Sequence, residues 1–276
     1  MKQKRHGLTL IEILVVLGII ALFVGLLLPA LSVVKNTAKE AKQKAQFNAI
    51  DIALMTFKND YGDYPPSEND RGNYCGAQKL SEALMGWDLL GFHPKSDFRA
   101  DGFNNAGYFI YDANSIDQRK GPYLEGENAN AFRLGEVPAE NKHGLFADTA
   151  PLAPDTYVLC DVFGMTKVRF SNGTVVTAGA PILYYRANTS GRTLREIYRV
   201  EDNDALVQVK EVADGPELDQ NPLGIAGNNY QYFYDYIMDP KIETRAWPYR
   251  PDSYILISAG ADGLYGTGDD IRNFGN

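Results

Sequence analysis

The stretch Gly7-Leu8-Thr9-Leu10-Ile11-Glu12 opens an apolar run that continues to Val34 and decides how this chain is organised. Three basic residues lie between Lys2 and Arg5, and Glu12 is the only charged residue within the run. A helix over residues 8–34 would be about 40 Å long, which exceeds a bilayer core of about 30 Å. A carboxylate in such a helix costs about 2.5–3.5 kcal/mol near the bilayer centre, so Glu12 indicates a function that needs a partner.

An ordinary secretory signal does not explain this segment. Its apolar core spans about 7–15 residues and precedes the cleavage site, whereas the only plausible junction here, Gly7, comes before a much longer run. A plain signal anchor explains the apolar run, but it explains neither Gly7 at the junction nor Glu12 inside the span.

The pattern resembles the class III leader of type IV pilins and type II secretion pseudopilins. The resemblance implies cleavage by a prepilin peptidase after Gly7, methylation of the new N-terminus at Leu8, and a role for Glu12 in assembly. Leu8 departs from the usual phenylalanine of the family but keeps its apolar character. The implied partners are further copies of the chain, minor pseudopilins and an inner-membrane assembly platform, with the N-terminus in the cytoplasm and the globular part exported.

The helix is expected to continue beyond the apolar run, because residues 38–59 contain neither proline nor glycine. Two strips at helical spacing form a wide apolar face. The first comprises Ala41, Ala45, Ala49 and Ile52, and the second comprises Phe47, Ile50, Leu54 and Phe57. The helix should end near residues 60–62, before Pro65 and Pro66.

The expected fold class is α+β, with a long N-terminal helix packed on a C-terminal antiparallel β-sheet domain, as in the lollipop shape of pilins. The expected parts are a leader at 1–7, a transmembrane half-helix at 8–34, an amphipathic half-helix at 35–61, an irregular insertion with short helices at 62–155, and a β domain at 156–276. Within the insertion, residues 77–90 are a helical candidate.

The strand candidates all lie in the last part of the chain, and Ser171-Asn172-Gly173 is a hairpin turn between two of them. They are residues 156–160, 167–170, 174–177, 182–186, 206–212, 230–237 and 253–258. The segment Asp161-Val162-Phe163-Gly164 is similar to an Asp-Pro-Trp-Gly segment of major pseudopilins.

The C-terminal run from Ser258 to Ile271 combines three aspartates with four glycines. Calcium prefers six to eight oxygen ligands in flexible geometry, and glycines let backbone carbonyls turn inward. The spacing is not that of an EF-hand, but it resembles the calcium loop of major pseudopilins. That resemblance implies Ca²⁺ bound by Asp262, Asp269 and Asp270, with carbonyls near Ile257, Ser258 and Leu264. The alternative is a polar surface turn.

Cys75 and Cys160 are the only cysteines. An exported domain would allow a disulfide between them, and two unpaired buried thiols are the alternative. The net charge of −8 argues against nucleic acid as a main partner. No hydrolase, phosphate-loop or dinucleotide motif is present, so we expect no enzymatic activity.

Three functions are compatible with these features. The first is a structural subunit of a type II secretion-like pseudopilus. The second is a type IV pilin or minor pilin for adhesion, motility or DNA uptake. The third is a membrane-tethered exported binding module with a pilin-type leader. A tether needs only the span, whereas a filament subunit also needs Gly7, Glu12 and an amphipathic continuation of the helix.

Overall fold

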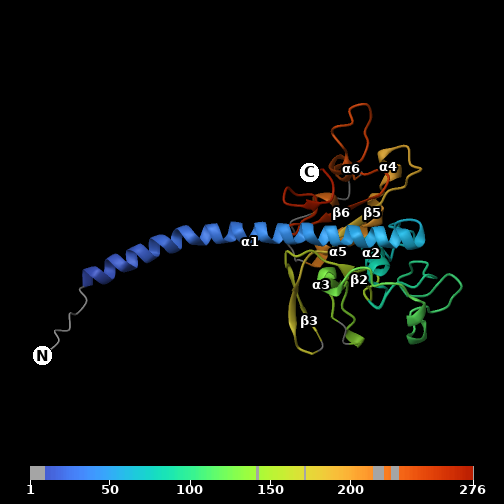
Figure 1. The fold of residues 1–276 in the computed structure, drawn as a ribbon, viewed down its shortest axis with the longest axis horizontal. Helices are drawn as coiled ribbons and strands as arrows, with labels where there is room; N and C mark the ends of the chain where they lie inside the picture. Colours follow the sequence, from blue (N-terminus) through green and yellow to red (C-terminus); the bar gives the residue numbers. More distant parts are fainter. Residues whose placement is uncertain (1–9, 141–142, 171, 214–220, 225–229, 276) are drawn as a thin grey trace. The chain divides into compact units, whose positions relative to one another are not determined.

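The computed structural model describes residues 10–140, 143–170, 172–213, 221–224 and 230–275 (Figure 1). Side chains are not described for residues 26–30, 32, 127–128 and 210–213. The chain divides into two compact units, residues 1–41 and residues 42–276. Gly7 and Leu8 therefore lie outside the described residues.

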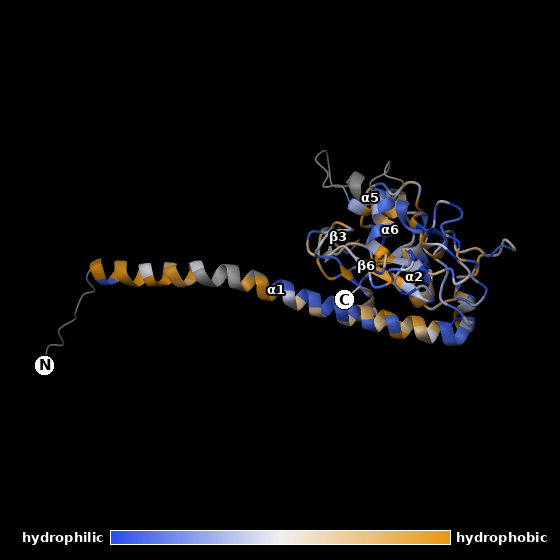
Figure 2. Cartoon of the chain, turned by 90° about the horizontal axis from the view of Figure 1, so that it is seen from above, coloured by the Kyte–Doolittle hydropathy of each residue, from blue (hydrophilic) through white to orange (hydrophobic). Residues whose placement is uncertain are grey.

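Helix α1 runs from Leu10 to Tyr61 and contributes to both units. It ends where the sequence predicts, because Gly62 adopts a φ of 88° and donates its N–H to the carbonyl of Lys58 at 2.7 Å. A positive φ suits glycine and stops a helix at this point. Figure 2 shows the hydropathy along α1, which is largely apolar in the first part of the helix and mixed further along.

The centre of the second unit is an antiparallel sheet of three strands in the order β5-β6-β7. These are β5 (Leu183–Arg186), β6 (Tyr254–Ser258) and β7 (Ile271–Arg272), with Leu183 opposite Ile257 and Ser258 opposite Ile271. All five residues of β6 are buried, so this strand is covered on both faces.

Alternate residues of the sheet enter two different cores, as the two-residue period of a strand requires. Tyr184 and Leu256 join the cluster that contains Phe47, Ile50, Leu54 and Phe57 of α1. Leu183 and Ile257 join the other cluster, which contains Leu206 and Phe233. The predicted fold class, a long helix with a C-terminal antiparallel sheet domain, is confirmed.

Only one of the two predicted helix strips is buried. Phe47, Ile50, Leu54 and Phe57 are at most 4% exposed, as predicted. The strip through Ala45 and Ile52 is wrong as a core face, since Ala45 is exposed and Ile52 is 66% exposed.

The predicted insertion contributes to the core. Helix α2 (Gly76–Met85) overlaps the candidate at 77–90, and it contacts β5 and β2 (Tyr157–Leu159). The remaining elements of this segment are short. They are η1 (Ala113–Gln118), α3 (Gly126–Ala129), β1 (Ala131–Arg133), which pairs with β2, and η2 (Pro138–Glu140).

The predicted hairpin is present as β3 (Thr166–Arg169) and β4 (Val175–Ala178). Two other strand predictions are wrong, because residues 206–212 lie in α5 (Asp204–Ala213) and residues 230–237 lie largely in α6 (Gln231–Ile237). Both segments also carry apolar residues at helical spacing. Phe233 and Ile237 are both fully buried and stand four residues apart.

The last elements are short and connect β5 to α5 and α5 to α6. They are α4 (Leu194–Ile197), η3 (Val200–Asp202) and η4 (Pro222–Gly224).

Candidate functional site

The N-terminal part of α1 has an apolar surface around its whole circumference. The large apolar side chains described between residues 10 and 24 are each at least 47% exposed, and Leu31, Val33 and Val34 are at least 50% exposed. A helix that is apolar all round is normally buried in a protein core or a membrane. Among the residues described, however, no helix has the length and apolarity required of a membrane span. The predicted span at 8–34 is therefore not confirmed.

Glu12 lies in the first turn of α1 and is exposed. A carboxylate is favourable there, because the unpaired N–H groups of a helix N-terminus carry partial positive charge. In the sequence, Glu12 follows the predicted processing junction at Gly7 by five residues.

Within the second unit, a cluster of side-chain amides fixes the C-terminal part of α1 to residues 160–162, and we call Gln43, Gln46 and Asn130 the amide clasp. The Gln43 side-chain carbonyl accepts the N–H of Val162 at 3.0 Å. The Gln46 amide donates to the carbonyl of Cys160 at 3.0 Å. Asn130 donates to the carbonyls of residues 160 and 161 at 3.0 and 2.5 Å. The backbone of residues 160–162 is therefore bound from two sides.

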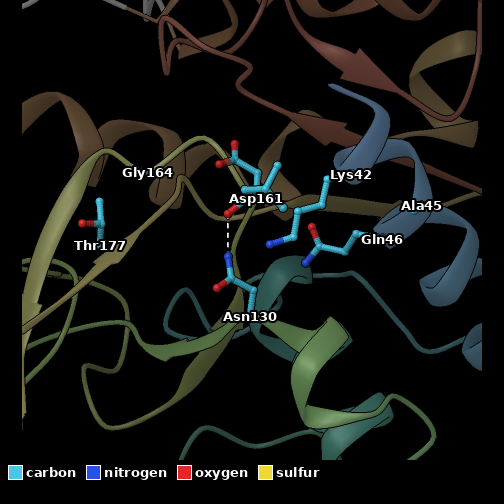
Figure 3. Close-up of a pocket in the computed structure, with 8 residues that line it drawn as sticks. Lys42, Ala45, Gln46, Asn130, Asp161, Gly164 and Thr177 are labelled. Atoms are coloured by element: carbon cyan, nitrogen blue, oxygen red, sulfur yellow. Dashed lines mark hydrogen bonds between the residues drawn. The ribbon is translucent and has the colours of Figure 1, made fainter. Parts of the chain in front are cut away.

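The amide clasp borders a cavity of about 190 Å³ (Figure 3). Figure 3 shows Lys42 and Gln46 of α1 on one side and Asn130 on another, with the Asn130–Asp161 hydrogen bond drawn. The cavity is small and polar. Its lining residues are Lys42, Ala45, Gln46, Asn130, Asp161, Val162, Gly164 and Thr177.

Asp161 is fully buried and ties three segments together. Its Oδ1 accepts the N–H groups of Phe163 at 3.0 Å and Ala180 at 3.2 Å. Its Oδ2 accepts the hydroxyl of Ser258, in β6, at 2.9 Å. Gly179 permits this approach, because a Cβ there would lie 2.1 Å from Oδ1. The Asp-Val-Phe-Gly segment thus begins with a buried structural carboxylate.

The predicted calcium loop connects β6 to β7, and its aspartates accept hydrogen bonds from other residues of the loop. Asp269 accepts the N–H groups of Ala261 and Asp262 at 2.7 and 2.9 Å and the hydroxyl of Thr267 at 2.6 Å. Partial burial raises the pKa of Asp269, but these hydrogen bonds outweigh it and lower the pKa below its usual value.

The other two aspartates of the loop face different partners. Asp262 accepts the N–H of Leu264 at 2.8 Å, and Asp270 accepts the hydroxyl of Tyr236 and the N–H of Gly266. Within the described ranges, no three His, Cys, Asp or Glu side chains gather as a metal site would require. Ca²⁺ binding by Asp262, Asp269 and Asp270 stays a prediction from the sequence.

The proposed carbonyl ligands also have other roles. Ile257 and Ser258 belong to β6 and pair with neighbouring strands, while the carbonyl of Leu264 accepts the hydroxyl of Thr267 at 3.4 Å.

Cys75 and Cys160 are both free, fully buried thiols in the same apolar cluster. Burial raises the pKa of Cys75 to about 12, which leaves it protonated and unreactive at neutral pH. Of the two alternatives, the structure has the unpaired thiols.

The comparisons with known proteins concern the N-terminal segment. A family model described as the prokaryotic N-terminal methylation motif matches residues 2–28. The chain carries a type IV pilin-like leader. This match covers the basic residues, Gly7 and Glu12 on which the sequence interpretation depends, and leaders of this kind are typically processed by prepilin peptidase. No curated protein and no solved structure gives a significant match.

The sequence interpretation did not predict that the amide clasp and Asp161 hold residues 160–163 in place by hydrogen bonds. A signal for the clasp was present, since Gln43, Gln46 and Ile50 fall at the spacing of the buried strip. The contacts of Gln43 and Gln46 to residues 160–162 carry no local signal, because the partners lie 119 and 114 residues apart along the chain.

Proposed function

We propose that this chain is a structural subunit of a type II secretion-like pseudopilus, assembled through its N-terminal helix after removal of residues 1–7 and methylation of the Leu8 amine. The observation that carries the proposal is α1 itself. Its N-terminal part exposes apolar side chains all round, and the same helix continues into a packed domain. Such a surface must be covered, and a bundle of identical helices would cover it.

In this proposal the apolar run is held in the bacterial inner membrane before assembly, with residues 1–7 in the cytoplasm and the globular part exported. Prepilin peptidase, minor pseudopilins and an inner-membrane assembly platform are the partners. Support comes from the pilin-like leader and from the apolar character of residues 8–34 in the sequence.

Exposed apolar side chains on the C-terminal part of α1 favour a filament subunit over a simple membrane tether. Ile52 and Met55 are 66% and 54% exposed on the part of α1 that lies in the second unit. A tether has no use for apolar side chains there, whereas a filament subunit can bury them against a neighbour. Neighbouring genes for a secretion ATPase and an outer-membrane secretin would favour a pseudopilin over a pilin.

Processing is tested by intact mass after coexpression with an active prepilin peptidase. We expect the loss of residues 1–7 and the gain of one methyl group on Leu8. Gly7→Val is the matched variant, and it should retain the leader. A mature wild-type protein that keeps residues 1–7 under these conditions contradicts the proposal.

Assembly is tested with Glu12→Val, compared with Glu40→Val. Both glutamates are exposed on α1, but only Glu12 lies within the matched motif. If Glu12 pairs with the Leu8 amine of a neighbour in an apolar bundle, removing it leaves a buried charge, which typically costs about 3–5 kcal/mol. We expect Glu12→Val to lose filaments and Glu40→Val to keep them. Equal filament yields would rule out the pairing role.

A further inference from the structure

A second surface site lies far along the chain from the N-terminal motif, in residues 93–118. It is a groove of about 230 Å³ between the turn at residues 104–110 and η1. The two sides are joined at their base, because Phe92 and Lys120 exchange backbone hydrogen bonds at 2.8 and 2.9 Å. The lining residues are His93, Lys95, Asn104, Tyr108, Phe109, Ile110, Asp112, Asn114, Ser115 and Gln118.

One wall of the groove presents aromatic rings to solvent. Tyr108 is 70% exposed and Phe109 is 39% exposed. Phe103, which packs on Phe109, is 37% exposed as well, and a contiguous exposed apolar patch is the kind of surface that marks contacts with other molecules. The rings are also supported from behind, because Phe109 packs edge-on against Trp87 at 5.9 Å between centroids and against Phe103 at 5.4 Å.

The turn that carries these rings is rigid. Asn104 donates its N–H to the carbonyl of Tyr108 and accepts the N–H of Tyr108 on its side chain, both at 2.9 Å. The N–H of Asn105 donates to Asp97 at 2.6 Å. A preorganised wall loses little conformational entropy when a ligand binds.

The opposite wall and the floor supply hydrogen-bonding groups that remain available. The side-chain amides of Asn114 and Gln118 and the hydroxyl of Tyr108 make no hydrogen bond within the part of the chain that the structure describes. Each amide offers both donors and an acceptor. The charges of the groove balance, since Lys95 and Asp112 both line it.

His93 forms part of the floor and is 3% exposed. Its Nδ1 accepts the N–H of Lys95 at 3.1 Å, so the neutral ring carries its hydrogen on Nε2. Burial lowers the pKa of His93, as do the positive charges of Arg119 and Lys95, which keeps the ring neutral. Nε2 has no protein partner among the described residues, so it is a further donor beside the groove.

We propose that this groove binds a pyranose ring of a polysaccharide chain. One face of such a ring carries C–H groups that pack on an aromatic ring such as Tyr108 or Phe109. Its hydroxyls both donate and accept, which matches the amides of Asn114 and Gln118. A charged ligand is disfavoured by the balanced charges, and a purely apolar one would cover His93 Nε2 and the amides without giving them hydrogen-bond partners.

The test uses the full chain in a detergent without a sugar headgroup. The chain has two tryptophans, so Trp247→Phe leaves Trp87, behind the aromatic wall, as the only source of tryptophan emission. This background is titrated with a β-1,4-glucan oligomer and, separately, with an N-acetylated chitin oligomer. Isothermal titration calorimetry on the unaltered chain measures the same equilibrium without relying on fluorescence.

We expect saturable binding of at least one oligomer at millimolar concentration. If only one oligomer binds, that oligomer identifies the class of polysaccharide. If both bind, the groove recognises the pyranose ring that they share. Tyr108→Ala and Gln118→Ala should each weaken binding by about tenfold, which corresponds to about 1.4 kcal/mol. Tyr232→Ala, which removes a 47% exposed tyrosine outside the groove, should leave the affinity unchanged.

The proposal is overturned if neither oligomer gives a calorimetric or fluorescence response, or if Tyr108→Ala and Gln118→Ala bind as tightly as the parent chain. Binding of a proline-rich peptide without any sugar binding also overturns it, because the aromatic wall would then serve a protein partner. Thermal melts of the variants show whether a loss of binding reflects the groove, in which case Tm is unchanged.

Discussion

Replacement of Asp161 tests whether this buried carboxylate fixes the region around the amide clasp. Asp161→Ala removes the acceptor of two backbone N–H groups, those of Phe163 and Ala180, in residues that are both 3% exposed. A buried donor left without a partner costs about 1–3 kcal/mol. The two together predict a loss of about 2–6 kcal/mol in the free energy of unfolding.

The matched variant is Asp161→Asn, which keeps one side-chain oxygen as the acceptor of both N–H groups. Its amide can donate to Ser258 in place of the hydroxyl bond that Asp161 accepts now. We therefore expect Asp161→Asn to recover most of the loss. Asp252→Ala, at an exposed site of the same unit, should change stability by less than about 0.5 kcal/mol.

The assay is thermal unfolding of the full chain in detergent, followed by tryptophan fluorescence and circular dichroism. For a domain of this size about 1 kcal/mol shifts Tm by about 2–4 °C, so Asp161→Ala should lower Tm by about 10 °C. If Asp161→Asn falls as far as Asp161→Ala, the negative charge matters rather than the acceptor. If Asp161→Ala melts like wild type, the reasoning is refuted.

Three further outcomes follow from described contacts. Burial raises the pKa of Asp202 to about 7, against about 3.9 when unfolded, so the folded state binds more protons and stability should fall as the pH rises from about 4 to 7. Asp202→Asn keeps the hydrogen bond from Ser67 but cannot titrate. The midpoint of urea unfolding should therefore depend less on pH between about 4 and 7 in Asp202→Asn, whereas Asp252→Asn should keep the pH dependence of wild type. Asp269→Ala should lower Tm even in EDTA, because the N–H groups of residues 261 and 262 lose their acceptor. If the loop binds Ca²⁺, wild type should gain about 2.7 kcal/mol at a hundredfold excess over Kd, and identical melting in Ca²⁺ and EDTA would exclude the site.

Local patterns in the sequence predicted the elements whose signal is local. The lack of proline and glycine at 38–59 predicted the length of α1, and the turn at 171–173 predicted the β3–β4 hairpin. The strand predictions failed at residues 206–212 and 230–237, because their apolar residues also fit a helix. Leu206 and Phe233 pack with Leu183 and Ile257 on the face of the sheet opposite the α1 cluster, and this tertiary packing favours helices α5 and α6 over strands.

The sites were predicted less completely than the fold, for a physical reason. The leader is a contiguous motif, so the sequence alone defines it. The groove at 93–118 depends on the bridge between Phe92 and Lys120, and no local pattern indicates that bridge. The metal assignment of the C-terminal aspartates comes from a resemblance to a known loop and stays a prediction, and the sequence does not show that Asp269 accepts N–H groups of its own loop.

Residues 160–163 link the two parts of the molecule that the proposed function requires. The carbonyl of Cys160 accepts a hydrogen bond from Gln46, and the N–H of Val162 donates one to Gln43. Both glutamines lie on α1, so these bonds hold this part of the helix on the domain. The Asp161 carboxylate accepts the hydroxyl of Ser258, the last residue of β6 before the C-terminal loop. Since one short segment holds both, a change at Asp161 should loosen the attachment of α1 and the start of the loop together.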